Sequence, residues 1–168
     1  NISFGASGRI LGLNGTLTAS TGTSAYGGTV NVSANAILDA GTGASLSLST
    51  LSAGSAAFSK GTGAGTVIFT GSNAGNSGAF TINGGTVQIG NGGLTGTLTT
   101  GTVTDNGNLV FYRTASAGTV LTLGSMMGAG SITGTGNFTF NAPSNALTID
   151  RAITLTGANS RILLEADS

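Results

Sequence analysis

Residues 65–90 read GTVIFTGSNAGNSGAFTINGGTVQIG, and this stretch decides the fold. Val67 and Phe69 form an apolar pair around one residue, and Val87 and Ile89 repeat the arrangement twenty residues later. Such period-two alternation places one set of side chains on each face of a β-strand. Glycine pairs such as Gly84-Gly85 mark the turns between strands. The stretch therefore predicts short strands joined by tight turns.

The same pattern continues in both directions. Successive apolar pairs open at intervals of 16, 21, 20 and 22 residues, at Val30, Leu46, Val67, Val87 and Leu109. Coils of about twenty residues cannot bury an apolar face alone, so they must stack on their neighbours. A sandwich or a barrel is the alternative, but the strands are very short and the pattern is uniform. We expect an all-β parallel β-helix, or β-solenoid, of roughly eight degenerate coils, forming a single domain over residues 1–168.

The composition excludes several classes of function. Charged residues make up 6% of the chain and the net charge is zero, whereas ordinary domains have about 25% charged residues. We expect no nucleic-acid partner, since five cations cannot form a basic face, and no insertion of this segment into a membrane. Cys and His are both absent, which removes thiolate ligands and the commonest general base. Hydrophobic residues at 39% argue against disorder.

The quoted stretch resembles the autotransporter-associated β-strand repeat. That repeat opens with G-T-L-x-L-x-G-x-N and closes with I-N-G-G-T-L-x-x-G, which residues 82–90 match well. The middle departs from the repeat, because Gly75 stands where an aromatic residue is usual. Residues 118–136 look like the linker between such repeats, and the repeat-like region covers about residues 61–160. The first sixty residues share the general pattern of short alternating segments and glycine turns, but not the motif of the repeat.

The resemblance implies a right-handed parallel β-helix from an autotransporter passenger domain. Proteins of that family are secreted to the surface of Gram-negative bacteria, where they serve as adhesins or scaffolds. We therefore expect a non-catalytic, extracellular cell-surface protein, with a ligand on a host or a neighbouring cell as one possible partner.

The acidic residues do not form a catalytic pattern. A glycosidase needs two carboxylates facing one cleft, but the five acids are scattered: Asp39, Asp105, Asp150, Glu165 and Asp167. Asp39 and Asp105 precede turn sequences and are interpreted as turn residues. Asp150 and Arg151 are adjacent, so in a strand they would point to opposite faces. We expect no enzyme activity, no catalytic, cofactor-binding or metal-binding residues, and no cofactor.

Three alternatives remain open. The first is a self-assembling filament or surface-layer subunit that stacks end to end. Neither terminus shows a cap: Ile2 and Phe4 open the chain, while Ile162 and Leu164 would point to one face and Leu163 to the other. Tyr26, Tyr112 and Arg113 are the candidates for lateral contacts, since Tyr and Arg are enriched at interface centres.

The second alternative is an ice-binding solenoid. Thr-x-Thr pairs recur, although their spacing varies, at Thr16/Thr18, Thr97/Thr99, Thr102/Thr104, Thr133/Thr135 and Thr154/Thr156. Regular alignment of these side chains on one flat face is the condition for this reading. The third alternative is a polysaccharide-active enzyme, because β-helices often have this function. The scattered acids argue against it.

Overall fold

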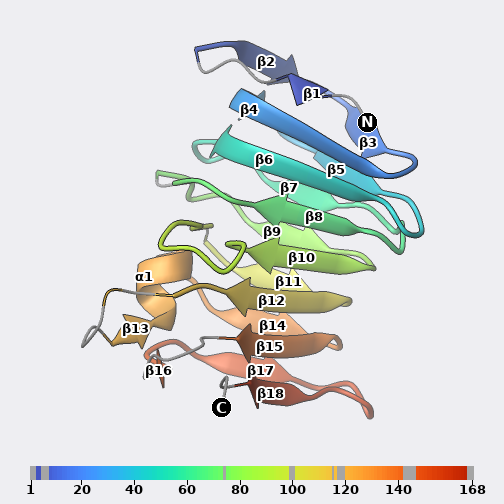
Figure 1. Cartoon of the computed structure of the whole chain (residues 1–168). Coiled ribbons are helices and arrows are strands. Elements are labelled where there is room, and N and C mark those ends of the chain that lie inside the picture. The colour runs from blue at the N-terminus through green and yellow to red at the C-terminus, as the bar shows by residue number, and fades with distance from the viewer. Residues whose placement is uncertain are drawn as a thin grey trace.

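The computed structural model describes residues 3–4, 8–73, 75–98, 101–114, 116, 120–141 and 147–165. The chain winds into an all-β solenoid of about seven turns with almost no helix, as the alternation predicted. Every strand pairing is parallel. In Figure 1 the front strands run from right to left while the chain descends and returns behind them, so the winding is right-handed.

Two parallel sheets form opposite walls of the solenoid. The front sheet contains β1 (Ser3–Phe4), β4 (Thr23–Val32), β6 (Ser45–Ser52), β8 (Thr66–Phe69), β10 (Thr86–Ile89), β12 (Asn108–Tyr112), β15 (Asn137–Asn141) and β18 (Ile162–Glu165), in that spatial order, with β2 (Ile10–Leu13) also pairing with β4. The back sheet contains β3 (Thr16–Ala19), β5 (Ala36–Ala40), β7 (Phe58–Lys60), β9 (Phe80–Ile82), β11 (Val103–Asp105), β14 (Ile132–Gly134) and β17 (Ile153–Leu155).

The core is a column of inward side chains between these walls. Val67, Val87 and Leu109 lie in one register, as predicted, and all three are buried. Phe69, Ile89 and Phe111 form the adjacent row, also as predicted. Aromatic rings continue the packing between turns: the Phe58 and Phe80 centroids are 4.6 Å apart, and those of Phe111 and Phe138 are 5.6 Å apart. Because each turn buries its apolar side chains only against its neighbours, the stack is one continuous core.

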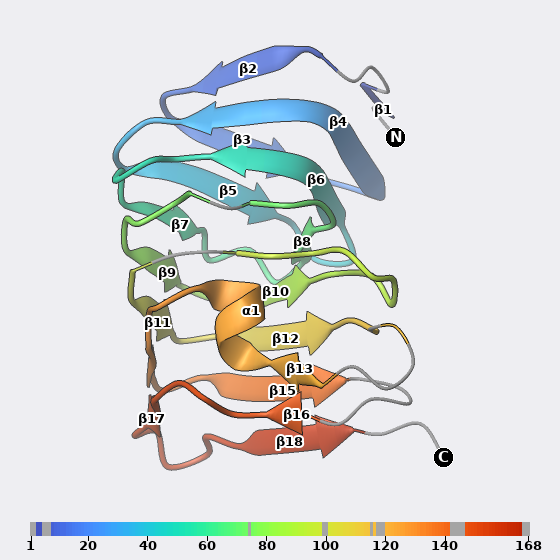
Figure 2. The same ribbon diagram turned by 90° about the vertical axis from the view of Figure 1, so that its left-hand side faces the viewer.

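The interval of 16 residues between Val30 and Leu46 does not span one turn of the solenoid. Leu46 pairs with Ser24, whereas Val30 pairs with Leu51. The cause is a register shift between Tyr26 and Thr29, where β4 bends round a corner onto a third side of the solenoid (Figure 2). Val30 and Leu46 therefore lie on two different sides of the solenoid. The residue one full turn after Val30 is Leu51.

The longest turn carries a short insertion on that third side. Asn108 and Asn137 are register partners separated by 29 residues, whereas Thr23 and Ser45 are separated by 22. The extra residues form β13 (Leu121–Thr122) and helix α1 (Leu123–Met127), beside β16 (Leu147–Thr148) (Figure 2). These longer turns explain why the solenoid has about seven turns where roughly eight were expected.

Helix α1 is held by packing rather than by helix propensity. Thr122 is its N-cap, with its hydroxyl accepting from the Ser125 amide, and Leu123, Met126 and Met127 are buried against the core. The helix lies inside the predicted linker of residues 118–136, where a helix was not expected. Among the described residues, no helix has the length and hydropathy needed to cross a bilayer.

Candidate functional site

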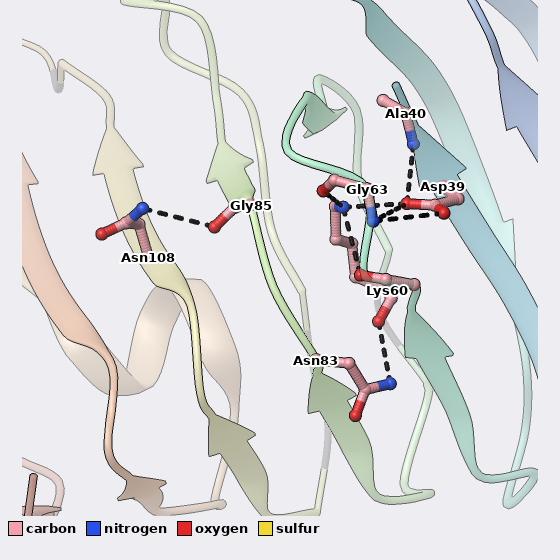
Figure 3. A network of polar contacts seen from close by, with 8 residues as sticks. Asp39, Ala40, Lys60, Gly63, Asn83, Gly85 and Asn108 are labelled. Atoms are coloured by element: carbon pink, nitrogen blue, oxygen red, sulfur yellow. Dashed lines mark hydrogen bonds and ion pairs between the residues drawn. The ribbon is translucent and has the colours of Figure 1, made fainter. Parts of the chain in front are cut away.

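A buried ion pair joins two turns of the back sheet. Lys60 occupies an inward position of β7 between Leu38 and Ile82, and its side chain is fully buried. Its Nζ donates to Asp39 Oδ1 at 2.9 Å, and also to the carbonyl oxygens of Gly61 and Gly63 (Figure 3). A buried ammonium requires such partners because its desolvation is costly. No role was predicted for Lys60 from the sequence, although the alternation in Phe58-Ser-Lys60 places its side chain on the inward face of the strand.

The Asp39 carboxylate links its own turn of the solenoid to the following turn. It accepts from the Ala40 amide at 2.9 Å and from the Gly63 amide at 3.1 Å, in addition to Lys60. Burial raises the pKa of Asp39, but the Lys60 hydrogen bond and the two amides outweigh it and hold that pKa below its usual value. The expectation that Asp39 is a turn residue is wrong, because it lies within β5 and bonds to the turn of the next coil.

Asp105 is a second acid of the same sheet and, unlike Asp39, it is fully buried. It ends β11, and its Oδ1 accepts from the Gly107 amide at 3.0 Å, which confirms its role in starting a turn. Its Oδ2 is buried and has no hydrogen-bond partner within the part of the chain that the structure describes. Burial raises the pKa of Asp105 to about 6.

The remaining described acids make structural contacts near the C-terminus. Asp150 and Arg151 do not point apart as expected, since they lie outside any strand and pair at 3.1 Å. Asp150 Oδ1 also accepts from the Gly124 amide at 2.7 Å, and Arg151 Nε donates to the Gly128 carbonyl at 2.7 Å, so the pair holds both ends of α1. Glu165 accepts from Asn141 at 3.2 Å. Asp167 lies outside the described residues.

Asp39 and Asp105, the two acids of the back sheet, are too far apart to act as a glycosidase pair. Asp39 and Asp105 lie on β5 and β11, with β7 and β9 between them. Three strand spacings of about 4.8 Å give a separation of about 14 Å, beyond the roughly 5–9.5 Å that glycoside hydrolysis uses. Among the residues that the structure describes, no group of three or more acids could hold a metal ion.

The three candidates for lateral contacts lie at two places. Tyr26 is half-buried and lines an apolar cavity of about 490 Å³ at the N-terminal end, together with Leu11, Leu17 and Leu46. Tyr112 and Arg113 lie side by side at the end of β12. The Arg113 guanidinium donates to the carbonyls of Gly96 at 3.1 Å and Leu94 at 2.7 Å, and partial burial lowers its pKa.

Buried amides replace strand pairing where a turn is irregular. Asn73 Oδ1 accepts from the Leu51 amide, and its Nδ2 donates to the Thr97 carbonyl at 2.6 Å, so one side chain joins three turns. Asn76 Oδ1 likewise accepts from the Ala53 amide of the preceding turn, at 2.7 Å. Neither role was predicted from the sequence, although Asn73 is the last residue of the opening motif of the repeat; Asn76 stands in the middle stretch that departs from it.

The back sheet also presents rows of hydroxyl groups to solvent. Thr81, Thr104, Thr133 and Thr154 are mutual register partners on β9, β11, β14 and β17. Of the predicted Thr-x-Thr pairs, Thr133/Thr135 and Thr154/Thr156 fall together in this region, and Thr104 contributes one member. Thr99 lies outside the described residues.

No family model, curated protein or solved structure matches this chain. The resemblance to autotransporter repeats therefore rests on the quoted sequence motif alone.

Proposed function

We propose that this chain is a non-catalytic scaffold segment of an extracellular protein on a Gram-negative bacterial surface, and that a further parallel coil, from flanking sequence or from a second copy stacked end to end, covers one or both of its edge strands. The observation that carries this proposal is the edge strand β18. Ile162 and Leu164 continue the inward column below Phe138 and Phe140, yet their side chains are 50% and 61% exposed. The surface location is inferred from the repeat-like motif.

The opposite end offers a matching apolar surface. Ile10 on β2 is 69% exposed, and the apolar cavity bounded by Leu11, Leu17 and Tyr26 lies beside it. All strands run parallel, so the lower edge of one copy and the upper edge of the next have the same polarity. Stacking would extend both sheets and the core column. Such a head-to-tail contact is heterologous and generates an open filament.

A scaffold role is favoured over catalysis because the acids serve structural contacts. Asp39 is neutralised by Lys60, and Asp150 by Arg151. Asp105 is enclosed in the core beneath the strand surface. Each of these three carboxylates therefore makes a structural contact.

Strand β18 allows a matched test of the stacking. Ile162 and Leu164 point toward the column, while Leu163 points outward beside Thr139, and it is 49% exposed. The double variant Ile162→Lys/Leu164→Lys should be monomeric in sedimentation velocity, because lysines would enter the apolar contact. The Leu163→Lys control should associate like the wild type. A wild-type chain that sediments as a monomer across the micromolar range contradicts the stacking.

A further inference from the structure

A row of four threonine hydroxyls runs along the outer face of the back sheet. Thr81, Thr104, Thr133 and Thr154 occupy the central outward position of four consecutive strands. In β9 and β11 the neighbours on either side point into the core, for example Phe80 with 0% exposure. The hydroxyls of these four threonines donate no hydrogen bond to any other residue that the structure describes. They are therefore available to an external acceptor or donor.

A second polar row lies two residues after the first, just beyond the C-terminal end of each strand. It consists of Asn83, Asn106, Thr135 and Thr156, all exposed. Contacts between turns fix their positions: Thr135 donates to Asn106 Oδ1 at 3.2 Å, and Asn83 donates to the Lys60 carbonyl at 3.0 Å. The two rows together form a lattice, which we call the hydroxyl face.

Strand propensity alone does not explain the regularity of the hydroxyl face. The corresponding outward row of the front sheet contains Ile68, Gln88, Val110, Thr139 and Leu163. That row has the same backbone geometry but no common chemistry. The insertion of α1 between β11 and β14 also leaves Thr104 opposite Thr133. The alignment of threonines is thus kept through the longest turn of the solenoid.

We propose that the hydroxyl face binds the ordered water of an ice surface. Strands repeat about every 4.8 Å across the sheet, so the hydroxyls of the first row recur at a spacing close to an oxygen repeat on faces of hexagonal ice. Each threonine hydroxyl can both donate and accept, which suits a lattice of water molecules. The two rows carry neither charge nor aromatic rings, so they lack the groups that bind ionic partners or stack on sugars. This inference is independent of the end-to-end stacking.

The test is thermal hysteresis together with partition into a growing ice front. The wild-type chain should show both activities. Thr104→Tyr/Thr133→Tyr should lose most of both, because two rings interrupt the flat lattice. The matched control Thr139→Tyr, on the front sheet, should retain them. Circular dichroism melting checks the fold, and Thr133→Ala serves if the double variant is unfolded; it should weaken both activities.

Three results would overturn the proposal. A folded wild-type chain with neither hysteresis nor ice partition would do so. So would retention on crystalline cellulose, without ice partition, that is lost in Thr104→Tyr/Thr133→Tyr, because the face would then belong to a glycan. An equal loss of ice activity in Thr139→Tyr would also count against it.

Discussion

Lys60 Nζ and Asp39 Oδ1 lie 2.9 Å apart across two neighbouring turns, with the lysine side chain fully buried and the aspartate 21% exposed. The pair stands inside a β-solenoid whose other inward positions are almost all apolar. A buried pair of this kind contributes little net stability by itself, but removing one partner leaves an unpaired charge.

Asp39→Ala should therefore lower the free energy of unfolding by about 3 kcal/mol, while Lys60→Met should cost less because it removes the buried charge. The double variant should be more stable than Asp39→Ala alone. Urea denaturation of the three variants measures this. Equal stability of Asp39→Ala and the double variant would show that the ammonium needs no carboxylate.

Asp105 should make stability depend on pH. Its folded pKa of about 6 is above the unfolded value of about 3.9. The protonated carboxyl therefore favours the fold: this contribution is complete below pH 4 and is lost as the pH rises through 6. Asp105→Asn should be more stable than wild type at pH 8, by up to about 3 kcal/mol, and the gap should close by pH 4. Thermal melts across that pH range measure it, and a constant gap would contradict the assignment.

Gly71 should not accept a side chain. A Cβ at this position would overlap the Ser49 carbonyl oxygen of the preceding turn. Gly71→Ala should destabilise the fold by about 1–3 kcal/mol. The control is Gly12→Ala on β2, where a Cβ meets nothing within 4 Å. That variant should change stability by less than about 0.5 kcal/mol. Chemical denaturation compares them, and similar losses would argue against the close approach of the turns.

Asn73→Ala should expose a backbone amide. The substitution leaves the Leu51 N–H and the Thr97 carbonyl without their amide partner. A loss of about 2 kcal/mol is expected, because buried polar groups without partners are costly. Hydrogen exchange should show faster exchange at Leu51, while the exposed Asn31→Ala control should leave it protected. Unchanged protection at Leu51 would mean that Asn73 does not hold this turn.

The core column was predictable because its signal is local. Val67, Val87 and Leu109 stand in short alternating segments, and large apolar side chains at every second residue have only one place to go. The interval between Val30 and Leu46 did not give the length of a turn for the opposite reason, since the bend in β4 is set by packing on a third side and leaves no local mark.

The polar interior was not predictable in the same way. The alternation in Phe58-Ser-Lys60 puts Lys60 inward, but a lysine in a strand is normally exposed, and only the structure shows Asp39 and the Gly63 carbonyl beside it as partners. The hydroxyl face was equally hidden. Spacings between threonines vary from turn to turn, and only the register shows that Thr104 and Thr133 are neighbours.

The turn that contains α1 shows where this architecture can vary in length. Asn108 and Asn137 remain hydrogen-bonded at 3.1 Å although 29 residues separate them. The strands of the front and back sheets stay paired across this turn, and the added residues lie on the third side (Figure 2). That side is a natural site for grafting: a peptide placed within the α1 turn would be displayed on a rigid rod whose walls need no redesign.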